Sequence, residues 1–265
     1  MIPSPATATR APAPWPSFER KRLRLEDGAT TTAHVARYPL ATTSLRVQRL
    51  PALARLEAWC VERGVDEALV GGFYVRGIAV SPGSPPTGLP LGELWLDGVL
   101  QNSVPFTHPW GERRACLSVV KGEVRIARRH ELPASPAGDL LQAGPLLVRE
   151  GRAVTGDEEG FSAAAEQFDS DITDGRHPRA ALGHDGEGLI ALACDGRADD
   201  EAGLTLAELA STMVALGTRE ALNLDGGGST SLVCGGRLRN NPREAHDVPV
   251  PGGRAIATAV MFQRR

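Results

Sequence analysis

The chain has 265 residues, a length that allows one large domain or two small ones, either with a sizeable core. A composition of 42% hydrophobic and 23% charged residues excludes collagen-like, wholly disordered and coiled-coil proteins. The formal net charge of −3 gives no overall positive field that would attract nucleic acid or an anionic membrane. The 30 glycines and 20 prolines favour many turns and short elements over long helical bundles.

The cysteines and the apolar runs bear on the cellular compartment. The four cysteines are spread along the chain without any C-x-x-C pair, which argues against a zinc site and against a dense disulfide framework. No apolar signal-peptide region is seen near the N-terminus, and the longest apolar runs fall far below the roughly 18 residues of a membrane span. We therefore expect a cytoplasmic protein without a membrane or nucleic-acid partner. The sequence does not indicate its oligomeric state.

The first 17 residues differ in composition from the rest of the chain. They contain five prolines among alanine, serine and threonine, which predicts a disordered tail, with one domain over residues 18–265. Two long loops are expected inside that domain, a proline- and glycine-rich one at 80–91 and a polar one that extends to about residue 176 and is a candidate flap. No repeat of fixed period is found, which disfavours a solenoid or propeller.

The N-terminal half reads mainly as short strands. Alternating residues over 22–26 and 31–38, separated by Asp27-Gly28, predict a β-hairpin. The segment from Pro51 to a stop at Gly64 has apolar residues at helical spacing and predicts an amphipathic helix. The region from residue 92 to 148 is typical of a β-meander.

The last third of the chain carries the strongest signals. Residues 188–194 form a continuous apolar run, 205–217 an amphipathic helical pattern, and 220–224 a second apolar run. If the two strands are parallel neighbours joined by the helix, Asp195 and Asp225 emerge at one edge of the sheet, where open sheets place their ligands.

Three consecutive glycines follow Asp225. Without Cβ atoms, Gly226, Gly227 and Gly228 can bring their amides close to a ligand as an anion-binding nest, with the Ser229 hydroxyl beside it. The alternative is a tight turn between two strands. The flanking aspartate and serine favour the binding role.

Other polar residues have structural explanations as well. Glu208 lies three residues after Thr205, a spacing that favours a capping box at the start of the helix. Arg179 and Arg254 open apolar runs and fit solvated strand ends. His177 and His184 belong to no cluster with metal-ligand spacing, so structural roles are favoured for both. No Ser-His-Asp order or G-x-S-x-G elbow is present.

At this point the sequence resembles the phosphodiester glycosidase domain family over most of residues 66–262. The resemblance rests on ordered motifs, of which the most specific runs from Ala221 to Thr230 through the three glycines. The others are Gly71-Gly-Phe-Tyr74, Gly144-Pro-Leu-Leu147, His177-Pro-Arg179, Asp195-Gly-Arg197, Leu204 to Ala210, and Asn241-Pro242. We expect an α+β fold, a single domain with a mixed β-sheet, few helices and a catalytic edge.

The sequence also departs from the family pattern. Val70 stands where the family usually has asparagine, Tyr74 replaces the last aromatic residue of that motif, and Ala180 replaces the usual threonine. These departures leave the sugar open and are compatible with a bacterial-type intracellular relative.

The resemblance implies hydrolysis of the bond between an anomeric carbon and a phosphodiester oxygen, which releases a free sugar and a phosphomonoester. Phosphate leaves readily, so the site is expected to stabilise negative charge on phosphate and positive charge on the sugar ring. The implied catalytic carboxylates are Asp225, Asp195 and Glu208, with their individual roles open. The implied substrate-binding residues are Arg179, Arg197, Arg254, Gly71, Gly72, Asn223, Gly226, Gly227, Gly228 and Ser229.

Two other classes of function remain open at this stage. Val70 and Ala180 are compatible with a carbohydrate- or nucleotide-binding homologue that has lost its chemistry. The aspartate pair is compatible with a Ca²⁺ or Mg²⁺ site that supports cleavage at phosphorus instead of carbon. Glycoside hydrolysis itself requires no cofactor, and its partner is a small sugar-phosphate substrate.

Overall fold

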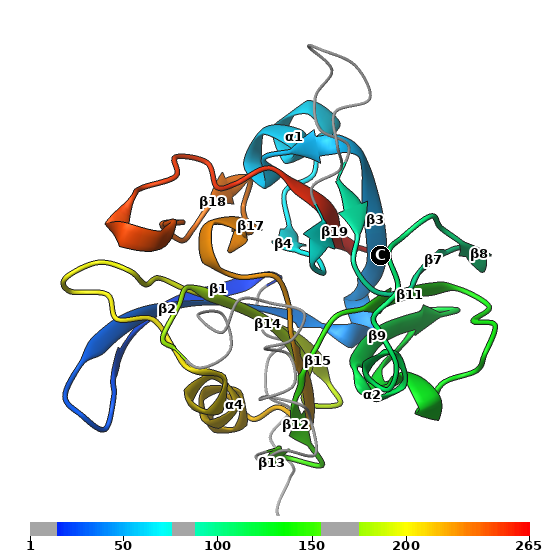
Figure 1. The fold of residues 1–265 in the computed structure, drawn as a ribbon, viewed down its shortest axis with the longest axis horizontal. Helices are drawn as coiled ribbons and strands as arrows, with labels where there is room; N and C mark the ends of the chain where they lie inside the picture. The colour runs from blue at the N-terminus through cyan, green and yellow to red at the C-terminus, as the bar shows by residue number, and fades with distance from the viewer. Residues whose placement is uncertain (1–14, 76–87, 155–174) are drawn as a thin grey trace, which may run out of the picture.

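A computed structural model of the chain describes residues 15–75, 88–154 and 175–265 (Figure 1). The described part is rich in β-strands and has few helices, as expected from the glycine and proline content. None of the helices in these three ranges is long and apolar enough to cross a membrane. Most of the predicted loop at 80–91 and of the candidate flap lies outside the described residues.

The largest sheet has seven strands in the order β1-β2-β15-β14-β16-β12-β13. The bounds are β1 Ser17–Arg24, β2 Thr30–Pro39, β12 Leu146–Arg149, β13 Arg152–Ala153, β14 Arg179–His184, β15 Gly188–Cys194 and β16 Glu220–Asn223. The hairpin predicted around Asp27-Gly28 is confirmed, because β1 and β2 pair antiparallel. Helix α4 (Leu206–Ala215) packs on one face of this sheet through its apolar side (Figure 1).

The strand, helix, strand order of the last third is confirmed, but its pairing is not. β15 and β16 run in the same direction, and β14 lies between them, antiparallel to both. The carboxyl ends of β15 and β16 therefore share an edge without being neighbours. All pairs between described strands are antiparallel, so the expected mixed sheet is wrong; a single bridge, between Leu91 and Val104, is parallel.

A second sheet has the order β18-β17-β4-β19-β3. The bounds are β3 Thr43–Ala54, β4 Ala68–Val70, β17 Leu232–Cys234, β18 Arg237–Leu238 and β19 Ile256–Arg264. The predicted helix begins later than expected, at Leu56, because Pro51 belongs to β3. Its predicted end is confirmed, since α1 (Leu56–Arg63) is capped by Gly64 in the left-handed region (φ 64°).

The third sheet, with the order β10-β9-β11-β7-β8, replaces the expected meander. β7 and β8 form one hairpin, β9 and β10 form another, and β11 lies between them. The bounds are β7 Leu94–Leu96, β8 Val99–Leu100, β9 Ala115–Val120, β10 Glu123–Arg128 and β11 Asp139–Gln142, with α2 at Trp110–Arg113 and a separate pair of β5 Tyr74–Val75 and β6 Leu89–Pro90. Short 3₁₀ turns occur at Leu40–Thr42, Arg129–Glu131, Gly227–Ser229 and Ala245–Asp247.

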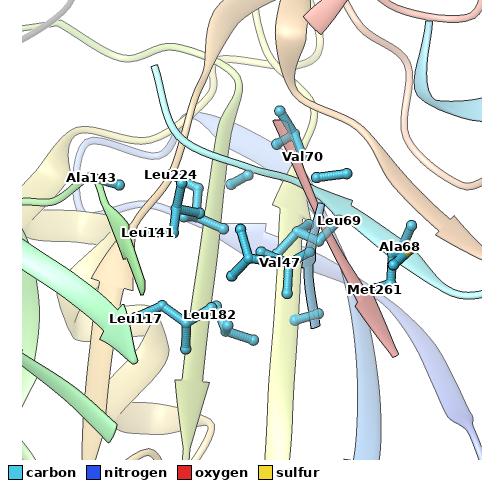
Figure 2. Close-up of a cluster of buried hydrophobic side chains, with 14 of the residues drawn as sticks. Val47, Ala68, Leu69, Val70, Leu117, Leu141, Ala143, Leu182, Leu224 and Met261 are labelled. Atoms are coloured by element: carbon cyan, nitrogen blue, oxygen red, sulfur yellow. The ribbon is translucent and has the colours of Figure 1, made fainter. Parts of the chain in front are cut away.

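Side chains from all three sheets share one hydrophobic core. Figure 2 shows Val47 and Leu69 of the second sheet close to Leu117 of the third and Leu182 of the first. Burial of this apolar surface is the main force that holds the sheets together. The ends of their strands are therefore fixed relative to one another.

The last three residues of the predicted tail, 15–17, belong to the described part of the chain. Trp15 donates a hydrogen bond from Nε1 to Thr43 Oγ1 at 2.7 Å and packs its ring edge-on against Tyr38, and Ser17 already begins β1. Residues 1–14 lie outside the described part.

The first and second sheets meet at a close backbone crossing. Gly71 follows β4, donates its N–H to the carbonyl of Thr258 in β19, and accepts the N–H of Asp225, which follows β16. A Cβ atom at Gly71 would lie 2.4 Å from Thr258 Oγ1 and 2.7 Å from its carbonyl carbon. Only glycine allows this approach, so Gly71 is a structural requirement for placing Asp225.

We predict that Gly71→Ala lowers the free energy of unfolding by about 1–3 kcal/mol, because the crossing must open to admit a methyl group. Denaturant unfolding of the variant and the wild type measures the difference. The loss should persist in a Thr258→Ala background, since backbone atoms of residue 258 also clash. An unchanged midpoint would show that the crossing is not tight.

Candidate functional site

A cavity of about 180 Å³ lies at the shared edge of β14 and β16. Of the residues that the sequence singled out, Asp225, Arg179, Arg197, Arg254, Asn223, Gly226 and Gly227 line it. The other lining residues are Phe73, Tyr74, His177 and Leu224. The sequence motifs therefore converge on one cavity, which is small compared with the roughly 300–1,000 Å³ of pockets for drug-sized ligands.

Asp225 is the carboxylate of this cavity. Its backbone N–H donates to Gly71 at 3.0 Å, and its Oδ1 accepts the N–H of Gly226 at 2.8 Å. Burial raises the pKa of Asp225 to about 6, while the Ser229 hydroxyl and the Gly226 amide lower it to a smaller extent. Asp225 therefore changes charge close to neutral pH, which is a property of many catalytic groups.

The glycine loop does not form the anion-binding nest that the sequence suggested. The Gly226 N–H is bound to Asp225, and the Gly227 N–H donates to the carbonyl of Pro178 at 2.8 Å. Gly227 has a φ of 60°, which favours glycine. Gly228 and Ser229 are buried beside the cavity and do not line it. The loop shapes and orients the site instead of offering three open amides.

Arg179 is a buried guanidinium at the start of β14. It is 2% exposed, and its Nε and Nη2 donate to the carbonyls of Leu204 and Gly175, both at 3.0 Å. Within residues 15–75, 88–154 and 175–265 it has no carboxylate partner. Burial, with a smaller contribution from the positive charge of Arg197, lowers the pKa of Arg179 to about 10. A buried cation without a counter-ion makes the cavity attractive to an anion.

Arg197 follows β15 and points back to the same cavity. Its Nε and Nη2 lie 3.3 Å and 3.2 Å from His177 Nδ1, and its Nη1 donates to the Arg243 carbonyl at 3.3 Å. Arg197 has a φ of 61°, an uncommon value for a residue with a side chain. The backbone is thus held in an unfavourable conformation that places this guanidinium at the site.

Arg254 is paired with the carboxylate of Glu244, a residue that the sequence analysis did not single out. Its Nε donates to Glu244 Oε1 at 2.6 Å, and its Nη2 is also bonded to Glu244. Glu244 fits against the loop because Gly228 has no side chain, since a Cβ there would lie 2.6 Å from Glu244 Oε1. The position of Glu244 two residues after the Asn241-Pro242 motif is the signal that could have identified it.

Asn223 is the last residue of β16 and is almost fully buried. Its Nδ2 donates to the carbonyl of Leu224 at 2.9 Å and to that of Gly144 at 3.4 Å. The side-chain amide thus braces the strand end beside Asp225.

Asp195, expected to be catalytic, lies outside this cavity. Its carboxylate accepts hydrogen bonds from His34 Nε2 at 3.0 Å and from the backbone and side-chain nitrogens of Asn241 at 2.6 and 2.9 Å. Burial opposes ionisation, but these donors hold the pKa of Asp195 below its usual value. Both oxygens of this carboxylate have structural partners, and Asp195 borders a different cavity from Asp225, so the structure does not bring the two predicted carboxylates together; a catalytic role of Asp195 stays a prediction.

Glu208, Gly71 and Gly72 are also absent from the cavity lining. Glu208 closes the capping box with Thr205, the structural alternative weighed from spacing, and binds Arg176 through both of its carboxylate oxygens. The Gly72 N–H is bound to Thr258 Oγ1 at 3.0 Å. These residues support the fold around the site, and none of them lines it.

A metal centre does not emerge from the described ranges. No three His, Cys, Asp or Glu side chains gather there in a way that could hold an ion. Asp195 and Asp225, the pair that the sequence offered for such an ion, border different cavities.

Known proteins resemble this chain in sequence and in fold. The family model described as phosphodiester glycosidase matches residues 64–263. N-acetylglucosamine-1-phosphodiester alpha-N-acetylglucosaminidase from Mus musculus is 33% identical over 106 residues, and the protein of that name from Homo sapiens is 31% identical over the same length. Each match covers 40% of this chain and about 20% of the relative, so the aligned part is a fifth of the relatives' length.

Solved structures show the same fold. The catalytic domain of the zebrafish enzyme of that name, auto-inhibited by its pro-peptide, superimposes with a TM-score of 0.68 at 22% identity, over 98% of this chain and 87% of that one. A protein of Burkholderia pseudomallei described as exported gives a TM-score of 0.64 at 16% identity, over 89% and 74%. The family model covers most of the chain, and the chain belongs to the phosphodiester glycosidase family.

Proposed function

We propose that the protein hydrolyses the bond between the anomeric carbon of a sugar and a phosphodiester oxygen, releasing the sugar and a phosphomonoester. The observation that supports this most directly is the placement of Arg179, a buried guanidinium without a carboxylate partner in the described ranges, in one cavity with Asp225. The family membership supports the kind of reaction.

The three arginines supply the phosphate-binding part of the proposal. Arg179 and Arg197 present planar guanidinium groups, which match the oxygens of a phosphate better than an ammonium group does. The positive charge of Arg254 is balanced by Glu244, so the cavity has a net attraction for an anion without a large excess of charge. Charge that develops on the departing phosphate is thereby stabilised.

Asp225 supplies the carboxylate chemistry. A phosphomonoester is a good leaving group, so protonation of the leaving oxygen is less important than for an ordinary glycoside. The ionised form of Asp225 is then the useful one, either to activate water or to stabilise or attack the anomeric carbon. Glu244 is the second carboxylate near the site and takes the place that the sequence gave to Asp195 and Glu208.

Two of the three departures from the family motif lie outside the cavity lining, and the third, Tyr74, belongs to it. Val70 and Ala180 are both fully buried in strands β4 and β14, and neither lines the site. The case for a binding protein without chemistry rested on these two residues. Their position in the core therefore favours the catalytic alternative.

We predict that Asp225→Asn reduces kcat by about 10²- to 10⁴-fold, the usual contribution of a positioned acid or base. With a panel of sugar-1-phosphodiesters, wild-type activity should rise with pH through about 6 and then level off, because the carboxylate must be ionised. Asp199→Asn, at an exposed position after Arg197, is the matched control.

The effect of Asp225→Asn on stability is expected to be opposite to its effect on activity. Since the folded protein raises the pKa of Asp225, native stability should fall as pH rises from about 4 through 6, and asparagine should remove this loss. An Asp225→Asn protein that melts no lower than the wild type at pH 7 and is inactive confirms a functional role. Full activity of that variant would exclude Asp225 from the reaction.

We predict that Arg179→Lys raises KM for the phosphodiester by about tenfold or more, because a lysine cannot reproduce two parallel donors and is costly to bury charged. Steady-state kinetics of Arg179→Lys and of Arg237→Lys, an exposed arginine on β18, measure the effect. Equal KM values for the two variants would contradict a phosphate-binding role for Arg179.

The bond that breaks can be identified with ¹⁸O-labelled water. Cleavage between carbon and oxygen places the label in the sugar, which is the expected result. Label in the phosphate would mean attack at phosphorus and would favour the metal-assisted phosphodiesterase alternative. Mass spectrometry of both products distinguishes the two outcomes.

A further inference from the structure

The imidazole of His177 and the guanidinium of Arg197 contact each other inside the cavity. Two nitrogens of the guanidinium, Nε and Nη2, lie 3.3 and 3.2 Å from the same imidazole nitrogen, Nδ1. A guanidinium has only donors, so Nδ1 must provide a lone pair. The ring is therefore neutral, with its hydrogen on Nε2.

The rest of the surroundings leaves Arg197 little freedom to move. Its Nη1 donates to the Arg243 carbonyl at 3.3 Å, and a Cβ at Gly227 would lie 3.1 Å from the same nitrogen. The guanidinium is thus confined between the imidazole, the carbonyl and the bare face of the glycine loop. Because the backbone of Arg197 is itself in the left-handed region, these contacts decide where the side chain points.

His177 is held independently of its side chain. Its backbone N–H and carbonyl exchange hydrogen bonds with Leu204 at 3.2 and 3.0 Å, next to the buried Arg179. A change of the imidazole therefore leaves the main-chain anchor of this segment in place. The imidazole is therefore placed to orient the Arg197 side chain, and it is not needed to anchor its own segment.

We propose that His177 is a positioning residue, which as the neutral imidazole fixes the Arg197 guanidinium in the orientation that receives the phosphate of the ligand. The phosphate in this proposal is that of the proposed function, and only its binding is concerned. Two like charges, Arg179 and Arg197, occupy one cavity, and the lone pair of His177 Nδ1 gives the Arg197 guanidinium a fixed acceptor there. Loss of the acceptor would allow the side chain to turn away.

The test is a double-mutant cycle on binding of inorganic phosphate, followed by calorimetry. His177→Leu removes the acceptor, and Arg197→Met removes the guanidinium. His177→Asn keeps an acceptor, because the Oδ1 of asparagine is the same number of bonds from Cβ as the Nδ1 of histidine. We expect His177→Leu to weaken phosphate binding by about tenfold or more and His177→Asn to regain most of it. In the Arg197→Met background, His177→Leu should have little further effect.

The outcomes separate this inference from the proposed function. Equal losses from His177→Leu in both backgrounds, or no recovery in His177→Asn when its melting temperature matches the wild type, would overturn the positioning role. Absence of phosphate binding in the wild type would overturn it as well. Turnover of sugar-1-phosphodiesters is measured in parallel. If His177 and Arg197 are coupled in phosphate binding but the wild type turns over no substrate, the proposed function alone is contradicted. If the wild type turns over substrate but the two residues are not coupled, the positioning role alone is contradicted.

Discussion

The hydrogen bond from Asp225 to the carbonyl of Gly71 is the constraint on which the site depends. It joins the end of β16 in the seven-stranded sheet to the residue after β4 in the second sheet, at a distance of 3.0 Å. The crossing is tight enough that any side chain at Gly71 would collide with Thr258. Because both sheets are fixed by a common core, the carboxylate of Asp225 has a defined place, and the arginines can be arranged around it.

The balance of charge explains why these residues are placed at a sheet edge with limited access to water. Three guanidinium groups and two carboxylates come together, and a cavity of this kind is stable only if each charge is bonded or awaits a counter-ion. Arg254 has Glu244, and the partners of Arg197 include the imidazole of His177 and the Arg243 carbonyl. Nε and Nη2 of Arg179 donate to carbonyls, and the guanidinium has no carboxylate partner in the described ranges, which makes it the strongest attraction for an anionic ligand.

The same balance sets the behaviour of Asp225. Its burial raises the pKa, and Arg254, whose positive charge lowers the pKa, is bound to Glu244, whose negative charge raises it. Arrival of an anionic phosphate would further disfavour a second negative charge in the cavity, whereas positive charge on a sugar ring would favour it. In the proposed reaction, the carboxylate is therefore best stabilised at the stage when the glycosidic bond breaks.

Local signals predicted the local elements well. The Asp27-Gly28 turn predicted the first hairpin, Gly64 predicted the end of α1, and Thr205 with Glu208 predicted the capped start of α4. Each of these depends on a few residues adjacent in the chain. The insertion of β14 between β15 and β16 depends instead on pairing over long separations, which a pattern of apolar residues does not encode.

The two aspartates show that the position of a residue at a strand end does not by itself predict its role. Asp195 and Asp225 follow strands of the same direction and reach the same edge, so the sequence treats them alike. Their environments differ because of their partners. His34 and Asn241, from distant segments, supply three donors to the first carboxylate, while the second has the neighbouring Gly226 amide and Ser229 hydroxyl and a cavity beside it. A carboxylate whose oxygens are all bonded lowers its own reactivity and stabilises the fold, whereas one that burial leaves poorly solvated is available for chemistry. The two aspartates are thus distinguished by donors that no local motif contains.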